Sequence, residues 1–436
     1  MEFKKSTVEE LIEQDVIEKP MDGNHGSIHP KTKDFTDVGI PFITAADIHS
    51  DKVDIEKANK LSEKDAHKLK KGFAKKRDVL LTHKASVGRT AIVNNMEYDY
   101  IILSPQVTYY RIKDTTTLLP EYLYLYFKSN YFNQIINQWA GGSTRKYIGI
   151  TAQKKLPILY PSIKNQKKIV DFIMTFEYKV QVNKKIIANL EELSQTLFKH
   201  WFVDFEFPDK NGNPYKSSGG EMIDSELGKI PDSWKIYKLK NIATHKKETF
   251  NPKKSEEVTV KHFSLPAYDN EEQAIEEEVN KIKSNKWIIN NNCVLFSKMN
   301  PDTKRIWLPV IDNKKLNVAS SEFVVMESPN NKINSFIYNI CLNSQFIDYL
   351  KANTTGSTNS RQRVKPTIAV NYKLAIEDSI VKKYSEIITP YMEEMKILRS
   401  EIGKLTQLRD TLLPKLMSGE LEISDDIEVN MDELSI

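Results

Sequence analysis

The sequence has few cysteines and no long apolar run, and each absence excludes a class of protein. Only Cys293 and Cys341 occur among the 436 residues, far from a CxxC spacing. Neither a disulfide scaffold nor a cysteine-type zinc site is therefore expected. No stretch approaches the roughly 18 apolar residues of a membrane span, and the N-terminal segment MEFKKSTVEELIEQ lacks the apolar core of a signal peptide. We expect a cytoplasmic protein with no membrane contact.

Motifs of the common enzyme classes are also missing. The chain contains no GxxxxGK[ST], no GxGxxG, no HExxH and no Asn-Pro-Pro-aromatic tetrapeptide, and its eight histidines are scattered. The segment around Pro301, Asp302 and Lys304 is superficially similar to a nuclease motif, but such acidic–basic triplets arise by chance in a charged chain. The sequence predicts a non-catalytic protein with no cofactor and no metal site.

The composition is that of a globular protein with a mild basic balance. Hydrophobic residues make up 40% of the chain, and a chain of this length exceeds what one core usually supports, so at least two domains are expected. The 63 basic and 59 acidic side chains give a net charge of +4. Part of the acidic charge is concentrated in 271–278 and 422–434. The remainder is more basic and can offer a phosphate-binding surface.

The strongest feature is an internal repeat with an offset of about 215 residues, half of the chain. The segment VLLT at 79–82 recurs as VLFS at 294–297, and GST at 142–144 recurs as GST at 356–358. The common offset and order matter more than any one pair. Solenoid repeats have periods of about 20–50 residues, so this repeat indicates a duplicated domain.

Each repeat is expected to contain short strands followed by a helix, because β-branched and aromatic runs alternate with turn residues. The expected strands of the first half lie at 43, 79–81, 91–93, 101–103 and 107–110, with a helix at 120–138. Those of the second half lie at 259–265, 294–297, 306–310 and 323–326, with a helix at 333–351.

A heptad pattern follows in each half. Apolar residues recur in steps of three and four from Ile169 to Leu197 and from Ile380 to Leu416, with Asn183 as a polar interruption. The pattern predicts two helices of roughly 40 residues, about 60 Å long, that pack on each other as an antiparallel coiled coil. The alternative is two unrelated surface helices. Pro390 is expected to kink the second helix or to start its main part, and Gly419 to follow its end.

Two polar loops in each half concentrate basic, hydroxyl and glycine residues after an apolar strand. Such loops offer donors to phosphates, while Arg, Lys, Asn and Gln can read base edges. A solvated loop with incidental charge is the alternative for any one loop, but both loops recur in both halves. The candidate DNA-binding residues are Lys84, Ser86, Arg89, Ser143, Thr144, Arg145, Lys146, Tyr147, Lys298, Asn300, Lys304, Arg305, Ser357, Thr358, Arg361, Gln362 and Arg363.

Several segments resemble one family, the DNA-specificity (S) subunits of type I restriction-modification systems. The segments LFKHWFVDFE at 197–206 and LRDTLLPKLMSGE at 408–420 look like the ends of its central and distal helices. IPDSW at 230–234 resembles the entry to its second recognition domain, and GIPFI at 39–43 an early strand of the first. The first half lacks a clear entry of the same kind.

The resemblance implies an α+β fold: two tandem-repeated α/β target recognition domains separated by two long helices packed as an antiparallel coiled coil. The corresponding boundaries are 1–163 for the first recognition domain, 164–206 for the central helix, 207–378 for the second recognition domain with its linker at 207–228, 379–420 for the distal helix, and 421–436 for an acidic tail.

The resemblance also implies partners. Double-stranded DNA with an asymmetric bipartite target would bind the two domains, and two methylation subunits and the restriction (motor/nuclease) subunits would bind the protein. The helix ends carry more apolar surface than a spacer needs, unless their aromatics only cap the adjoining domain. The candidate partner-binding residues are Phe198, Trp201, Phe202, Leu412 and Leu416.

Two other functions remain open from the sequence. A coiled-coil scaffold or interaction protein without intrinsic DNA specificity would bind only proteins and would show no salt-dependent DNA binding. A methyltransferase with fused recognition domains is opposed by the missing catalytic motifs.

Overall fold

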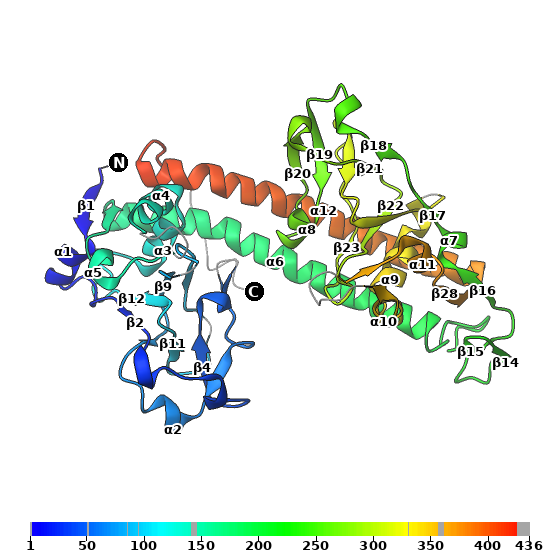
Figure 1. Ribbon diagram of the computed structural model, residues 1–436, viewed down its shortest axis with the longest axis horizontal. Helices are drawn as coiled ribbons and strands as arrows, with labels where there is room; N and C mark the ends of the chain where they lie inside the picture. The colour runs from blue at the N-terminus through cyan, green and yellow to red at the C-terminus, as the bar shows by residue number, and fades with distance from the viewer. Residues whose placement is uncertain are drawn as a thin grey trace. The chain divides into compact units, whose positions relative to one another are not determined.

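The computed structural model divides the chain into two compact units, shown with their secondary structure in Figure 1. It describes residues 2–49, 52–84, 86–94, 96–140, 146–329, 331–355 and 362–424. Unit 1 comprises residues 1–178 and 405–436, and unit 2 comprises residues 179–404. Two long helices, α6 (Ile163–Phe202) and α12 (Asp378–Ser418), each contribute one part to each unit.

Unit 1 contains two sheets built from the short apolar runs. The four-stranded sheet has the order β10 (Thr90–Ile92), β9 (Val79–Thr82), β12 (Val107–Tyr110) and β2 (Met21–Asp22). The five-stranded sheet has the order β3 (Phe35–Thr36), β7 (Asn59–Leu61), β4 (Ile40–Ile43), β11 (Ile101–Leu103) and β8 (Phe73–Ala74), with β4 and β11 parallel.

The central strand β9 shows why these runs form strands. Val79 and Leu81 face a core cluster shared with the helices of the unit, whereas Leu80 faces a second cluster shared with β11. Successive side chains of a strand point to opposite faces. A continuous apolar run is therefore the pattern of a strand that is covered on both sides.

Unit 2 repeats this architecture. Its four-stranded sheet has the order β17 (Thr244–His245), β25 (Phe323–Glu327), β22 (Cys293–Ser297) and β23 (Ile306–Trp307). Its five-stranded sheet has the order β18 (Thr249–Phe250), β21 (Lys286–Ile288), β24 (Asn317–Ala319), β19 (Thr259–Phe263) and β20 (Ile275–Glu278), with β19 and β24 parallel. The duplicated domain predicted from the repeat is confirmed.

Further elements complete each unit. A two-stranded pairing precedes each long helix: β1 (Lys4–Thr7) with β13 (Pro157–Tyr160), and β16 (Lys235–Lys238) with β28 (Lys373–Ile376). The remaining hairpins are β5 (Ile48–His49) with β6 (Lys52–Val53), β14 (Met222–Ser225) with β15 (Gly228–Pro231), and β26 (Thr354–Thr355) with β27 (Arg363–Val364). The short helices are α1 (Val8–Glu13), α2 (Glu63–Ala66), α5 (Ile150–Gln153), α7 (Leu239–Ile242), α8 (Leu265–Asp269) and α11 (Pro366–Ala369).

The single helix expected in each half is two helices. In unit 1, α3 (Pro120–Lys128) ends at Ser129, whose hydroxyl accepts a hydrogen bond from the Phe132 amide and so caps α4 (Asn130–Trp139). In unit 2, Asn343 likewise separates α9 (Asn334–Leu342) from α10 (Ser344–Ala352). The prediction is wrong at both breaks because a Ser or Asn cap starts a new helix.

The parts of α6 and α12 within each unit pack antiparallel, as predicted. In unit 2, the Asn183 amide donates to Glu401 at 2.8 Å, and the Tyr384 hydroxyl donates to the Ser194 carbonyl group at 2.9 Å. The residue numbers thus rise along one helix as they fall along the other.

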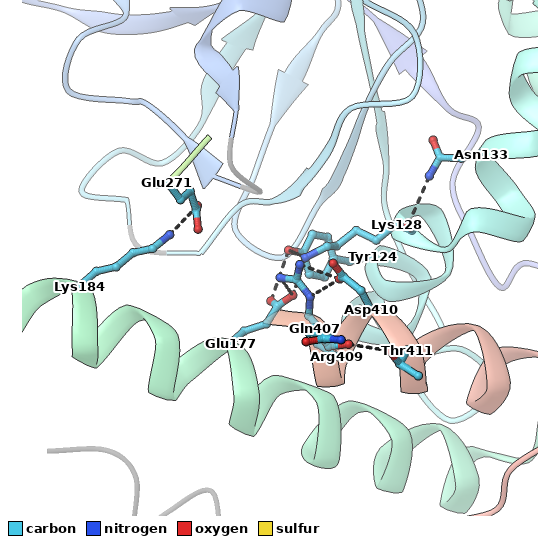
Figure 2. A network of polar contacts seen from close by, with 10 residues as sticks. All are labelled: Tyr124, Lys128, Asn133, Glu177, Lys184, Glu271, Gln407, Arg409, Asp410 and Thr411. Atoms are coloured by element: carbon cyan, nitrogen blue, oxygen red, sulfur yellow. Dashed lines mark hydrogen bonds and ion pairs between the residues drawn. The ribbon is translucent and has the colours of Figure 1, made fainter. Parts of the chain in front are cut away.

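In unit 1, Figure 2 shows the Glu177 carboxylate of α6 facing α3 and α12. It accepts from Lys128 at 2.5 Å and lies 3.6 Å from Arg409. Beside these ion pairs, Ile169 and Ile173 of α6 share a core with Leu416 of α12. The two helices of unit 1 are therefore joined by an apolar core and by charge.

The residues of α12 that are buried against α6 and the adjoining domain, its seam, depart from the predicted heptad. Ile387 is 42% exposed and Tyr391 is half-buried, whereas Ile388 and Met392 are buried. The buried steps are four, four and three from Tyr384 onward, a spacing closer to 3.6 residues per turn than a strict heptad. The helix runs through Pro390 without interruption, so the expected start there is wrong. It ends before Gly419, at φ +76°, as predicted.

Within the described ranges, no helix is both long enough and apolar enough to cross a membrane.

Candidate nucleic-acid interface

In unit 1, the structure brings the two polar loops together. Lys84, in the loop after β9, forms an isolated antiparallel bridge with Tyr147. Next to this bridge, the Ile148 amide donates to the His83 carbonyl group at 3.0 Å, and His83 Nδ1 lies 3.1 Å from the Ile148 carbonyl oxygen. The exposed Tyr147 ring rests on the buried His83 ring, with centroids 5.7 Å apart. The two polar loops therefore meet at this bridge.

Hydrogen bonds of Thr82, the last residue of β9, hold the first loop in place. The Thr82 hydroxyl donates to the Ser86 carbonyl group and accepts from the Arg89 amide at 2.9 Å. Gly88 adopts φ +97°, and a Cβ atom there would lie 2.8 Å from Asn133 Oδ1 of α4. A glycine is required because both the left-handed backbone and the close contact exclude a side chain.

Unit 2 joins its two polar loops at the equivalent position with different side chains. We call this meeting of the two polar loops in each unit the junction. Met299, after β22, bridges Arg363, and the Asn300 amide donates to the Gln362 carbonyl group at 2.9 Å. The Val364 amide donates to the Lys298 carbonyl group at 2.9 Å. Because bridges at equivalent positions recur in two sequences that differ, the convergence of the loops is a property of the duplicated fold.

Three candidate lysines are available to an anion. Lys84 and Lys304 are exposed and Lys298 is half-buried, and none of the three forms an ion pair with the described part of the chain. Lys146 donates to Asn137 of α4 at 2.9 Å, and Ser86 lies half-buried in its loop. The amino groups therefore provide the positive charge of both junctions.

The candidate arginines are largely engaged by the chain itself. Arg89 donates to the carbonyl groups of Ala45 and Ile48, at 3.2 and 3.4 Å. Arg305 forms a two-bond ion pair with Asp269, at 2.6 and 2.9 Å, and its side chain is mostly buried. Both guanidinium groups reach the segment after the first parallel strand, but Arg89 stays exposed. A DNA contact by either arginine stays a prediction.

Arg363 is different because half of its side chain remains exposed. It donates through two nitrogen atoms to Glu322, both at 3.2 Å. This pairing fixes the plane of the guanidinium group while leaving one edge accessible. The sequence did not single out Asp269 or Glu322, because each lies 36 or 41 residues from its arginine.

Part of the second loop lies outside the described residues in both halves. The candidates concerned are Ser143, Thr144, Arg145, Ser357, Thr358 and Arg361.

The aromatic residues expected on the outer helix face are covered. Phe198, Trp201 and Phe202 are buried and pack against Tyr384, while Phe202 also contacts Phe336 and Trp234. Leu416 is buried in the core of unit 1 and Leu412 packs against it. The expectation that these residues form exposed apolar surface is wrong, because they join the helices to the domain of their own unit.

The long helices expose other apolar residues that the sequence analysis missed. In unit 2, Leu193 of α6 is 56% exposed and Ile397 of α12 is 61% exposed, with Ile186 and Ile387 less so. In unit 1, Leu408 of α12 is 48% exposed. Except for Ile387, they fall outside the apolar positions of the predicted heptad, and a heptad analysis counts only the residues at those positions.

Protonation of His83 is expected to destabilise the first junction. Burial lowers the pKa of its imidazole below the ordinary 6.5, although the neighbouring Asp22 carboxylate, 4.0 Å away, opposes the shift. The folded protein therefore takes up the proton less readily than the unfolded chain. Stability should be unaffected above pH 6.5 and fall as the pH drops below it, by up to about 1.4 kcal/mol per pH unit.

The measurement is urea unfolding of unit 1 between pH 7.5 and about 5. His83→Gln should flatten the dependence, and the exposed His67→Gln should keep it. An equal slope for parent and His83→Gln would contradict this.

The described residues contain no cluster of three or more His, Cys, Asp or Glu side chains that could hold a metal ion.

Comparisons with known proteins find similar sequences and a similar fold. Residues 9–192 match the family model of the type I restriction modification DNA specificity domain. The chain is 25% identical over 438 residues to the type I restriction enzyme MjaIX specificity subunit of Methanocaldococcus jannaschii, covering 97% of each chain. It is 30% identical over 170 residues to the HindI specificity subunit of Haemophilus influenzae, covering 36% of each. Its fold is similar to the crystal structure of an S subunit from M. genitalium, with a TM-score of 0.53, 14% identity, and 95% and 96% of the two chains covered.

Proposed function

The chain belongs to the family of type I restriction-modification specificity subunits, and on that premise we propose that it recognises an asymmetric bipartite DNA target. Each unit reads one half-site through its loop junction, and the chain positions methylation and restriction subunits that carry the chemistry. The complex acts on cellular DNA, and we expect it in the cytoplasm.

The observation that carries this proposal is the recurrence of the junction. Both units join the loop after the central strand to the segment after the second polar motif, at equivalent positions. The residues displayed there differ, with Tyr147 over His83 in one unit and Arg363 beside Glu322 in the other. Two junctions of similar backbone structure but different side chains would read two different short sequences, which accounts for an asymmetric target.

The partner side of the proposal rests on the helices. Leu193 and Ile397 are the most exposed large apolar residues of the long helices among those described. We take these two residues as the candidate contacts of the long helices with another protein. We propose that two methylation subunits dock on α6 and α12 around such positions rather than around Phe198, Trp201 and Phe202.

Lysine and arginine variants separate the two kinds of DNA contact. For the chain assembled with a methylation subunit, Lys84→Ala or Lys298→Ala should weaken binding to all duplexes and lower the slope of log affinity against log salt by about one. Arg363→Ala should instead relax one position of one half-site, by about 1–3 kcal/mol, and leave the other half-site unchanged. Mobility shifts on target and random duplexes at two salt concentrations measure both effects.

The matched control is Lys68→Ala, because Lys68 is paired with Asp65 on the short helix α2. It should bind like the parent. If the Lys84, Lys298 and Arg363 variants also bind target and random DNA like the parent, the junctions are not the DNA interface. A parent complex without salt-dependent DNA binding would favour the coiled-coil scaffold instead.

A further inference from the structure

One short segment of unit 2, Asp269–Gln273, contacts both the candidate recognition loop and the long helices. It starts at the last residue of α8, and two of its residues, Glu271 and Glu272, have left-handed backbones, with φ +63° and +56°. Two consecutive non-glycine residues in this region are strained and persist only where surrounding contacts hold them. Those contacts point in two directions.

Toward the recognition loop, the segment holds Arg305 and its neighbours. Asp269 binds the Arg305 guanidinium group with two hydrogen bonds. The Tyr268 hydroxyl, at the end of α8, lies within 3.3 Å of the carbonyl oxygens of Lys304 and Ile306. The end of the loop that starts at Lys298 is therefore fastened to this segment.

Toward the helices, the segment meets a buried arginine of α12. Arg399 is 5% exposed, and its Nε atom lies 3.1 Å from Glu272. The same guanidinium group donates to Glu191 of α6 at 2.8 Å, and Glu191 also accepts from the Tyr338 hydroxyl of α9 at 2.6 Å. One ionic cluster thus joins the segment to both long helices and to α9.

Two further contacts fix the segment along the helices. Glu271 accepts from Lys184 of α6 at 2.6 Å, as Figure 2 shows. Gln273 donates to the Arg399 carbonyl group at 3.2 Å, and a Cβ atom at Gly403 would lie 2.6 Å from Gln273 Oε1. Gly403 therefore leaves the space that this side chain occupies on α12.

Such a cluster contributes more to geometry than to stability. Burial raises the pKa of Glu272, and Arg399 opposes that shift. Buried ion pairs gain little net free energy, since desolvation offsets the attraction, but they tolerate few alternative arrangements. In unit 1, Arg89 is the equivalent of Arg305, and it donates to backbone carbonyl groups instead of a carboxylate.

We propose that Glu272, Arg399 and Glu191 are positioning residues that hold the second recognition loop at one orientation to the helix pair. They would thereby set how strictly the complex requires one spacer length between the half-sites. This inference rests on the proposed function, because it concerns the distance at which the second half-site is read.

The test is methylation of a duplex library by the full chain assembled with its methylation subunits. The library keeps both half-sites and varies the spacer one base pair at a time. Glu272→Gln and Arg399→Lys should raise methylation at neighbouring spacer lengths by about fivefold relative to the parental length, with the half-site bases unchanged. The control, Lys404→Ala, changes an exposed residue of α12 directly after Gly403 and should keep the parental profile.

A spacer profile identical to that of the parent, or a uniform loss at every spacer length, would overturn the proposal, because a merely structural role lowers all lengths together. If either buried variant fails to fold, the double variant Lys184→Ala with Gln273→Ala gives the same readout from more exposed contacts. A parent complex that methylates no bipartite site would contradict the proposed function instead, so the two failures are distinguishable.

Discussion

Replacing Tyr384 with alanine is expected to lower the free energy of unfolding by about 3–5 kcal/mol, the range for large buried aromatic side chains. Tyr384 of α12 is fully buried, and Phe198, Trp201 and Phe202 of α6 surround its ring. Phe336 of α9 closes the cluster. Truncation would leave a cavity where both long helices meet the recognition domain of unit 2.

Two controls separate the ring from its hydroxyl group. Tyr384→Phe removes only the hydrogen bond to the Ser194 carbonyl group and should cost about 1 kcal/mol. Tyr391→Ala removes a half-buried ring from the same helix and should cost less than Tyr384→Ala. Urea unfolding of the full chain, followed by tryptophan fluorescence, measures all three. A Tyr384→Ala variant as stable as Tyr384→Phe would show that this cluster does not join the helices to the domain.

The central strands of both units could be predicted from sequence because their pattern is local. The segments at 79–82 and 294–297 are apolar up to their last residues, Thr82 and Ser297, and each lies in the middle of a sheet that is covered on both faces. The shortest outer strands of the two four-stranded sheets could not be predicted. Strands β2 and β17 have two residues each and form only because a longer strand offers them partners.

The long helices were predictable in extent, but not in which residues are buried. The heptad places Ile387 in the seam, whereas the structure buries Ile388. Shifts of this kind depend on how the partner helix and the adjoining domain share one face. The aromatics of α6 show the same effect, since the domain of unit 2 covers a face that the sequence pattern leaves open.

The loops of the candidate interface were predicted from their recurrence, and their meeting within each unit was not. Lys84 and Tyr147 are 63 residues apart in sequence, and no local signal pairs them. The contacts that Arg89 and Arg305 make within their own chain were missed for a related reason. An arginine after a strand has the same sequence pattern whether it faces a phosphate or a distant group of its own chain.

Removing one matched heptad from each long helix should shorten the DNA spacer by about three base pairs. Deleting 179–185 from α6 and 400–406 from α12 removes the paired residues Asn183 and Glu401 together. It keeps Glu177 with Arg409, and Glu191 with Arg399. Seven residues correspond to about 10 Å of helix at 1.5 Å per residue, and one base pair to about 3.4 Å.

Deleting the heptad from one helix alone is the control, because it misaligns the seam. That single deletion should abolish methylation instead of shifting the spacer.

Sequencing of methylated sites in DNA exposed to the matched-deletion complex tests the central claim, that the length of the two long helices sets the spacer between the half-sites. The account predicts that both half-sites keep their bases while the spacer between them becomes shorter by about three base pairs. Full methylation at the parental spacer length would contradict it, since the helices would then not set the distance between the half-sites.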